Sequence, residues 1–203
     1  MPHSPKPASD EALWLLLRQG DEAAFSALMR RYFGPLLNYG RKFTRDGERV
    51  KDGIQDLFAE LWLYRARLAE TTSVRTYLLT SLRRKLARSQ PPQQVPDDED
   101  TLAFLADFSV LDRWVEDDAE RQQLAQLNRL LNALPPRQKE AIYLKFYQNL
   151  SNEEIAAVLE VNYQSASNLI HRALNHLRDH WPEETVLGVL VIFNAQCSIF
   201  NVQ

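Results

Sequence analysis

The stretch "LSNEEIAAVLEVNYQSASNLIHRALNHLR", residues 150–178, contains the start signals of two short helices in close succession. Ser151 lies three places before Glu154, the spacing of a capping box, and Leu150 and Ile155 can close over the helix start as a hydrophobic staple. Asn162 is a second strong N-cap, so a second helix should begin at Tyr163. The gap between the helices is too short for a strand, and the pattern predicts a helix-turn-helix.

The second of these helices is expected to have one apolar and one polar face. Its apolar residues recur at offsets of three and four and form a single stripe: Ala166, Leu169, Ile170, Ala173, Leu174 and Leu177. The opposite face carries only neutral polar or basic side chains, namely Gln164, Ser167, Asn168, His171, Arg172, Asn175 and Arg178. Such a face suits base edges and phosphates in a major groove. An ordinary amphipathic helix remains the alternative for this segment alone.

Composition indicates an all-α protein of two small helical domains. The chain has 203 residues with only six Gly, and Leu, Ala, Arg and Glu are abundant. The single cysteine, Cys197, excludes an internal disulfide and a zinc site made of thiolates. The four His residues lack the spacing of a metal site, so we expect neither a metal ion nor a cofactor. No signal peptide is evident at the N-terminus, and we expect a cytoplasmic protein.

Charge is strongly segregated along the chain. Residues 30–90 contain fourteen Lys or Arg and six Asp or Glu, a net charge of +8, whereas residues 91–120 contain one Arg and ten acids, a net charge of −9. The basic block can hold phosphates despite the overall charge of −3. The acidic block is either a solvated linker or a mask that competes with DNA.

The first domain, residues 10–90, should consist of successive helices. We expect Asp10 to cap the first helix and Gly20 to end it, Asp21 to cap the second, and Asp52 with Gln55 to start the third. Gly34-Pro35 is expected to bend the second helix. After the loop "AETTS", a basic helix should begin at residue 74.

A linker and an apolar tail flank the second domain, which should span residues 121–181. Prolines and acids in "QPPQQVPDDED" mark a linker over residues 91–120. Within it, residues 101–120 have weak helical character, and Trp114 is expected to dock on a neighbouring element. Pro135 and Pro136 fit the first turn of a helix. In the tail, residues 182–203, the apolar run 186–193 is about half the ~20 residues that cross a bilayer, so we expect no membrane insertion. The tail could cover a groove, contact a regulatory protein or a second copy, or be poorly ordered.

Four stretches carry a resemblance to the sigma-70 superfamily, specifically its small two-domain extracytoplasmic-function (ECF) group. They are "DEAAFSALMRRYFGPLLNYGRKFT", "VKDGIQDLFAELW", "VRTYLLTSLRRKLAR" and "LNALPPRQKEAIYLKFYQNLSNEEIAAVLEVNYQSASNLIHRALNHLR". They occur in the family's order and cover most of residues 10–180. The resemblance implies a sigma factor that binds core RNA polymerase, recognises promoter DNA at its −10 and −35 elements and initiates transcription.

The resemblance also implies roles for residues. The polymerase-binding set is Asp52, Gln55, Asp56 and Phe58; the −10 set is Thr71, Thr72, Ser73, Arg75, Tyr77, Arg83 and Arg84; the −35 set is Gln164, Ser165, Ser167, Asn168, His171 and Arg172. This chain departs from the family at three positions: Tyr77 stands where Trp is frequent, Arg84 where Asn is frequent, and Glu160 where the turn usually has Gly. A left-handed Glu160 would cost on the order of 1 kcal/mol more than Gly.

Three other classes of protein are alternatives. A helix-turn-helix regulator that never binds polymerase needs neither the acidic third helix nor the loop before residue 74. A helical adaptor would bind protein alone. An enzyme fits least, because the sequence has no Gly-rich phosphate loop, no Ser/His/Asp order and no paired carboxylates at an evident cleft.

Overall fold

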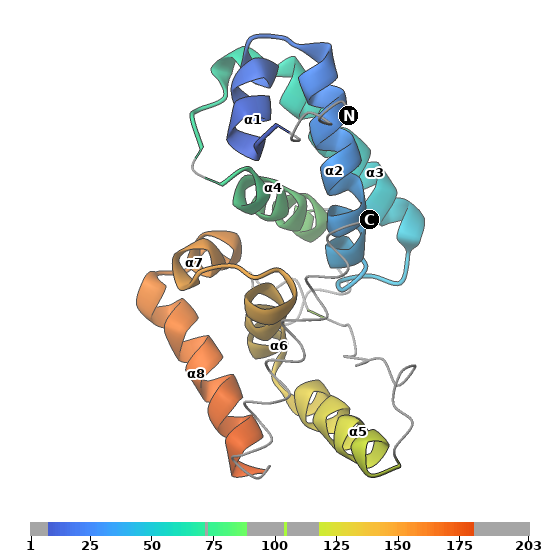
Figure 1. Cartoon of the computed structure of the whole chain (residues 1–203), viewed down its shortest axis with the longest axis vertical. Coiled ribbons are helices and arrows are strands. Elements are labelled where there is room, and N and C mark those ends of the chain that lie inside the picture. The colour runs from blue at the N-terminus through green and yellow to red at the C-terminus, as the bar shows by residue number, and fades with distance from the viewer. Residues whose placement is uncertain (1–7, 72, 89–103, 105–117, 181–203) are drawn as a thin grey trace, which may run out of the picture. The chain divides into compact units, whose positions relative to one another are not determined.

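Helices make up all the regular structure in the part of the chain that is described. The computed structural model describes residues 8–71, 73–88, 104 and 118–180 (Figure 1). The chain divides into two compact units, Met1–Leu102 and Ala103–Gln203. The predicted all-α class is confirmed.

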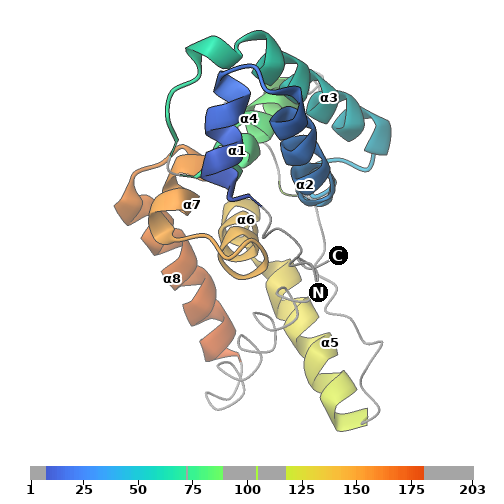
Figure 2. The same cartoon turned by 45° about the horizontal axis from the view of Figure 1, so that its top comes forward.

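The first unit is built from four helices around one core. They are α1 (Asp10–Arg18), α2 (Glu22–Gly40), α3 (Gly47–Leu63) and α4 (Val74–Arg88), and the short 3₁₀ helix η1 (Arg65–Arg67) follows α3. Helix α2 packs against α1, α3 and α4 (Figures 1 and 2). At Gly40 a Cβ would lie 2.4 Å from Val50 Cγ1, so glycine allows the end of α2 to approach α3 closely. Pro35 lies inside α2, and the helix continues through it.

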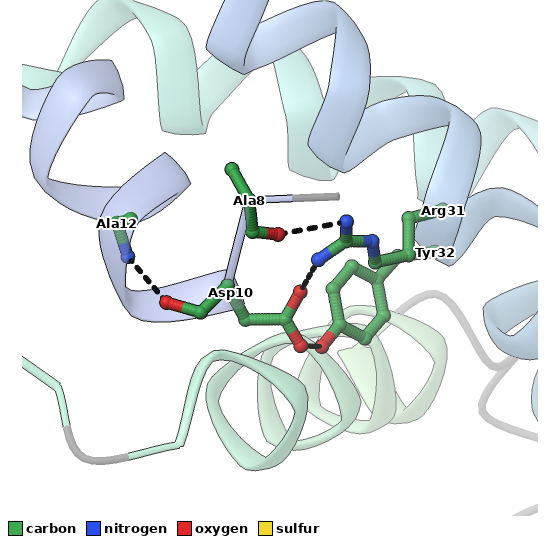
Figure 3. Close-up of polar contacts among 6 residues, drawn as sticks. Ala8, Asp10, Ala12, Arg31 and Tyr32 are labelled. Carbon is green, nitrogen blue, oxygen red and sulfur yellow. Dashed lines mark hydrogen bonds and ion pairs between the residues drawn. The ribbon is translucent and has the colours of Figure 1, made fainter. Parts of the chain in front are cut away.

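Helix α1 begins differently from the prediction. Ser9, not Asp10, is its N-cap, and the Ser9 hydroxyl accepts a hydrogen bond from the Ala12 amide at 3.3 Å. Asp10 instead joins α1 to α2, because its carboxylate accepts hydrogen bonds from the Arg31 guanidinium and the Tyr32 hydroxyl (Figure 3). Burial, reinforced by the Asp10 carboxylate, raises the pKa of Tyr32 well above its ordinary value, so this phenol remains a donor.

Helix α3 starts earlier than predicted, and the assignment of Asp52 as its cap is wrong. Asp46 is the N-cap, with its carboxylate accepting from the amides of Glu48 and Arg49 at 3.1 Å each. Val50 and Ile54, four places apart, are both fully buried. The apolar stripe therefore extends back beyond Asp52 and places this residue inside the helix.

The second unit is organised around its last helix. Its elements are α5 (Asp118–Ala133), α6 (Pro136–Ile142), the π-helix η4 (Tyr143–Tyr147), α7 (Asn152–Leu159) and α8 (Tyr163–Asp179). Helices α5, α6 and α7 all pack against α8. Pro136 is the first residue of α6 and Pro135 its N-cap, in agreement with the prediction. Phe104 is buried against the Tyr143 ring, with 5.6 Å between centroids.

Several predictions concern residues outside the described ranges. They include most of the acidic linker 91–120 with Trp114, and the apolar tail 182–203. No helix in the described ranges is long and apolar enough to cross a membrane.

Candidate nucleic-acid interface

The turn between α7 and α8 is set by local hydrogen bonds. Ser151 and Glu154 form the predicted capping box, with the Glu154 amide donating to Ser151 Oγ at 3.2 Å and the Ser151 amide to Glu154 Oε2 at 2.9 Å. Asn162 caps α8, since its Oδ1 accepts from the Ser165 amide at 2.7 Å. Between the two caps Glu160 adopts the left-handed conformation, with φ 56° and ψ 44°. The amide of Val161 then donates to the Ala156 carbonyl at 3.0 Å and closes the end of α7.

Helix α8 buries one stripe and exposes the predicted polar face. Ala166, Ile170, Ala173 and Leu177 are buried, whereas Gln164, Asn168, His171 and Arg172 are exposed. The exposed side chains are partly ordered by each other, because Gln164 Nε2 donates to Asn168 Oδ1 at 3.1 Å and Asn175 Nδ2 lies 3.0 Å from His171 Nδ1. The face presents donors, acceptors and a cation without an acid before Asp179, which is the chemistry of a DNA-reading surface.

One serine of the predicted −35 set, Ser167, also holds the fold. Ser165 and Ser167 are half-buried. Asn152, the first residue of α7, donates through Nδ2 to Ser167 Oγ at 3.2 Å and accepts from Lys145 Nζ at 2.9 Å. This chain of contacts ties α7 to α8 and to η4. The contact between Asn152 and Ser167 could not be predicted from the sequence, because no local pattern pairs residue 152 with residue 167.

The loop before α4 is shaped by its own hydroxyl groups. Thr71 Oγ1 donates to the Ser73 carbonyl and accepts from the Ser73 amide, each at 3.2 Å. Ser73 Oγ accepts from the Thr76 amide at 3.3 Å, which caps α4. Thr72, also predicted to contact DNA, lies outside the described residues. The side chain of Tyr77 is 37% exposed and that of Arg75 is half-buried.

The two arginines predicted to act together on the −10 element have different environments. Arg84 is exposed, but Arg83 is only 4% exposed. Arg83 shares its side of α4 with the buried Thr76, Leu79 and Leu86. Arg83 is therefore buried in this structure, and its contact with the −10 element stays a prediction.

The residues of the predicted polymerase-binding set also differ in their exposure. Asp52, Gln55 and Asp56 are exposed along one side of α3, as their spacing requires. Phe58 is only 2% exposed and packs edge-on against Phe25, with 6.1 Å between ring centroids. Phe58 therefore belongs to the core of the unit in this structure, and its contact with polymerase stays a prediction. In the described residues no group of three or more His, Cys, Asp or Glu could hold a metal ion.

Two protein-family models match this chain, one in each unit. The Sigma-70 region 2 model matches residues 28–89, and the Sigma-70, region 4 model matches residues 124–177. The first match covers α3, the loop and α4; the second covers the helix-turn-helix. A regulator with a helix-turn-helix alone does not account for the first match.

Curated relatives extend over nearly the whole chain. The ECF RNA polymerase sigma factor RpoE of Cereibacter sphaeroides is 28% identical over 180 residues, covering 85% of this chain and 97% of that protein. The RNA polymerase sigma-E factor of Streptomyces avermitilis is 26% identical over 166 residues, covering 80% and 88%, respectively. The RNA polymerase sigma-H factor of Pseudomonas aeruginosa is 25% identical over 176 residues, covering 81% and 89%.

Solved structures show the same fold. CnrH, solved in complex with the cytosolic domain of CnrY, matches with a TM-score of 0.56 and 24% identity over 84% of this chain and 95% of that chain. The sigma factor RpoE in complex with the anti-sigma factor NepR from Bartonella quintana matches with a TM-score of 0.54 and 19% identity, covering 76% and 94%. With regions 2 and 4 present in order and full-length ECF relatives, the chain belongs to the sigma-70 superfamily, in its extracytoplasmic-function group of RNA polymerase sigma factors.

Proposed function

We propose that the protein binds core RNA polymerase in the cytoplasm, recognises the −10 and −35 elements of promoter DNA and initiates transcription. The observation that carries this proposal is the order of the two matched regions: an exposed acidic helix face, a loop leading into a basic helix, and a helix-turn-helix with an acid-free reading face. Each surface alone has simpler explanations, but their combination fits a protein that must engage polymerase and two DNA elements.

The polymerase contact is proposed for α3. Asp52, Gln55 and Asp56 offer two carboxylates and an amide on one exposed side, suited to a basic partner surface. Phe58 supports this side from the core. By analogy with the family, the partner surface is the coiled-coil clamp of the largest polymerase subunit.

The −10 contact is proposed for the loop 69–73 and the start of α4. Tyr77 offers an aromatic ring for an unpaired base, while Arg75 and Arg84 supply positive charge for the phosphate backbone of the DNA. Stacking on an aromatic ring contributes roughly 1–3 kcal/mol per base in single-strand binding. The hydroxyls of Thr71 and Ser73 are engaged within the loop, so their role is to shape it as much as to contact DNA.

The −35 contact is proposed for α8, entering the major groove with its N-terminal half. Gln164, Asn168 and His171 would read base edges, and Arg172 with Ser165 and Ser167 would face the phosphates. The i, i+4 hydrogen bonds along this face lower the entropy lost when its side chains become ordered on DNA.

Regulation by an anti-sigma protein is a further part of the proposal. One related fold was solved with the anti-sigma factor NepR and another with the cytosolic domain of CnrY. These partners belong to those proteins. For this chain, co-purification followed by loss of transcription on adding the partner would establish such control.

Reconstitution with core polymerase and a library of promoter fragments tests the function. We expect specific transcription with core polymerase, and weak DNA binding by the free chain. Permanganate footprinting then reports unpaired thymines at the −10 element. Tight, sequence-specific binding by the free chain with no effect of polymerase would instead identify a conventional helix-turn-helix regulator.

A further inference from the structure

Helix α1 is attached to the loop that precedes α4. Trp14 is 2% exposed, and its indole Nε1 donates to the carbonyl of Ala69 at 3.0 Å. The same indole packs against the ring of Tyr77, with centroids 5.0 Å apart and planes inclined at 64°. One side chain of α1 therefore contacts both the backbone of the loop and the aromatic residue of α4.

Two more contacts join the end of α1 to this region. Arg18 Nη1 lies 3.3 Å from Glu70 Oε1, in the residue next to Ala69. Helix α1 also packs against the 3₁₀ helix η1 (Arg65–Arg67), which precedes the loop. Attachments thus occur before the loop, within it and at the helix that follows it.

We propose that α1 positions the −10 recognition loop and that Trp14 is the positioning residue. The proposal rests on the proposed function, because it assigns the loop and Tyr77 to the −10 element. Ordering a loop on binding costs conformational entropy, and a loop already held in one geometry avoids much of that loss. Trp14 holds the loop through Ala69 and supports Tyr77 from the side, so both should be ready for an unpaired base.

The hydrogen bond distinguishes this role from ordinary packing. Burial of the Trp14 ring needs only apolar neighbours, and a phenyl ring would satisfy most of that requirement. The bond from Nε1 to Ala69 instead links α1 to the backbone of a segment far along the chain. Removing the donor while keeping an aromatic ring should therefore affect the loop more than the fold.

Trp14→Phe is the appropriate test, because it deletes the donor without changing charge. In reconstituted holoenzyme we expect promoter opening to slow about 5-fold, the factor for one lost hydrogen bond. Binding to core polymerase and to a fragment carrying only the −35 element should be unchanged. Hydrogen exchange at the amides of Ala69, Glu70 and Thr71 should become faster.

Trp62→Phe is the matched control. Trp62 lies in the same unit; its ring packs against Phe25 with centroids 5.1 Å apart and faces Arg65 of η1 at 4.3 Å, and a phenyl ring keeps an aromatic face for both contacts. This substitution should leave promoter opening and exchange in the loop near wild-type values. Equal slowing by both substitutions would overturn the proposal, because it would reflect general loosening of the unit.

A second pair of variants keeps the test open if Trp14→Phe does not fold. Arg18→Gln and Arg30→Gln each remove one positive charge, but only Arg18 contacts the loop. We expect Arg18→Gln to slow opening about 2-fold more than Arg30→Gln, since an exposed ion pair contributes modestly. Equal effects would mean that charge alone matters, against the proposal.

Coupling within the loop gives the decisive comparison. If Trp14 acts through the loop, the effect of Trp14→Phe on opening should be smaller in a Thr71→Ala background, where the loop is already loosened. Independent, multiplicative effects would contradict the positioning role. Failure of the wild-type holoenzyme to open any promoter would reject the proposed function itself, whereas normal opening by Trp14→Phe would reject only this inference.

Discussion

Replacing Glu160 with glycine should stabilise the helix-turn-helix. Glu160 is exposed and has φ 56° and ψ 44°, a conformation in which its Cβ crowds the following carbonyl. That crowding costs roughly 1–2 kcal/mol for a residue with a Cβ. Glycine avoids it but loses roughly 0.5–1 kcal/mol more conformational entropy on folding. The expected net gain for Glu160→Gly is about 0.5–1 kcal/mol.

Native-state hydrogen exchange in the full chain measures this gain where it occurs. Amides of α7 and α8 that exchange through unfolding of their unit should be protected about 2–5-fold more in Glu160→Gly. Amides of α1 to α4 provide the internal reference, because they belong to the other compact unit. A thermal scan should show the corresponding transition shifted upward by a few degrees.

Glu160→Ala is the control that isolates the backbone effect. It removes the carboxylate, and with it whatever interactions the side chain makes, but retains the Cβ. We expect no stabilisation from this variant. Equal protection in Glu160→Ala and Glu160→Gly would refute the reasoning, because the gain would then come from loss of the side chain.

Five other substitutions test the proposed surfaces and the packing that supports them. Asp56→Arg should weaken association with core polymerase about tenfold or more in a pull-down titration, with circular dichroism unchanged; unaltered affinity would remove Asp56 from the interface. Asn168→Ala should lose −35 preference in fragment selection by roughly 1–3 kcal/mol, and a uniform loss across all sequences would indicate a phosphate contact. Arg84→Ala should reduce the salt dependence of promoter binding by about one phosphate contact, whereas Arg83→Ala should chiefly lower the thermal stability of the first unit; the opposite pattern would mean that the burial of Arg83 is lost in the complex. Ser151→Ala should lower the free energy of unfolding of the second unit by about 1 kcal/mol, as measured by hydrogen exchange. No change would show that the capping box contributes nothing.

Much of the second unit could be predicted because its signals are short-range. The capping box of Ser151, the cap of Asn162 and the apolar stripe of α8 involve residues within a few positions of each other. The sequence left open whether Glu160 is left-handed or the turn is reshaped, and in the structure Glu160 is left-handed. Local hydrogen bonds and helical periodicity decide such features with little help from distant residues.

Competition between equivalent local signals limited the prediction in the first unit. Asp46 and Asp52 are both good N-caps, as are Ser9 and Asp10. Asp46 is the N-cap of α3 because Val50 extends the buried stripe of this helix back beyond Asp52. Ser9 is the N-cap of α1 because the Asp10 carboxylate is bound to Arg31 and Tyr32 of α2. Both decisions depend on where a neighbouring helix lies, which no pattern within one helix reveals.

The sequence alone therefore determined the helical class, the helix-turn-helix with its exposed polar face, and the exposed side of α3 with Asp52, Gln55 and Asp56. Only the tertiary structure decided that Arg83 is buried and that Trp14 reaches Ala69. Helix α4 is packed by α1, α2 and α3, so more than one of its sides is covered, including positions that a single amphipathic stripe would leave exposed. Periodicity reports one preferred face of a helix, whereas burial on several sides and contacts between distant residues arise only when the helices are assembled.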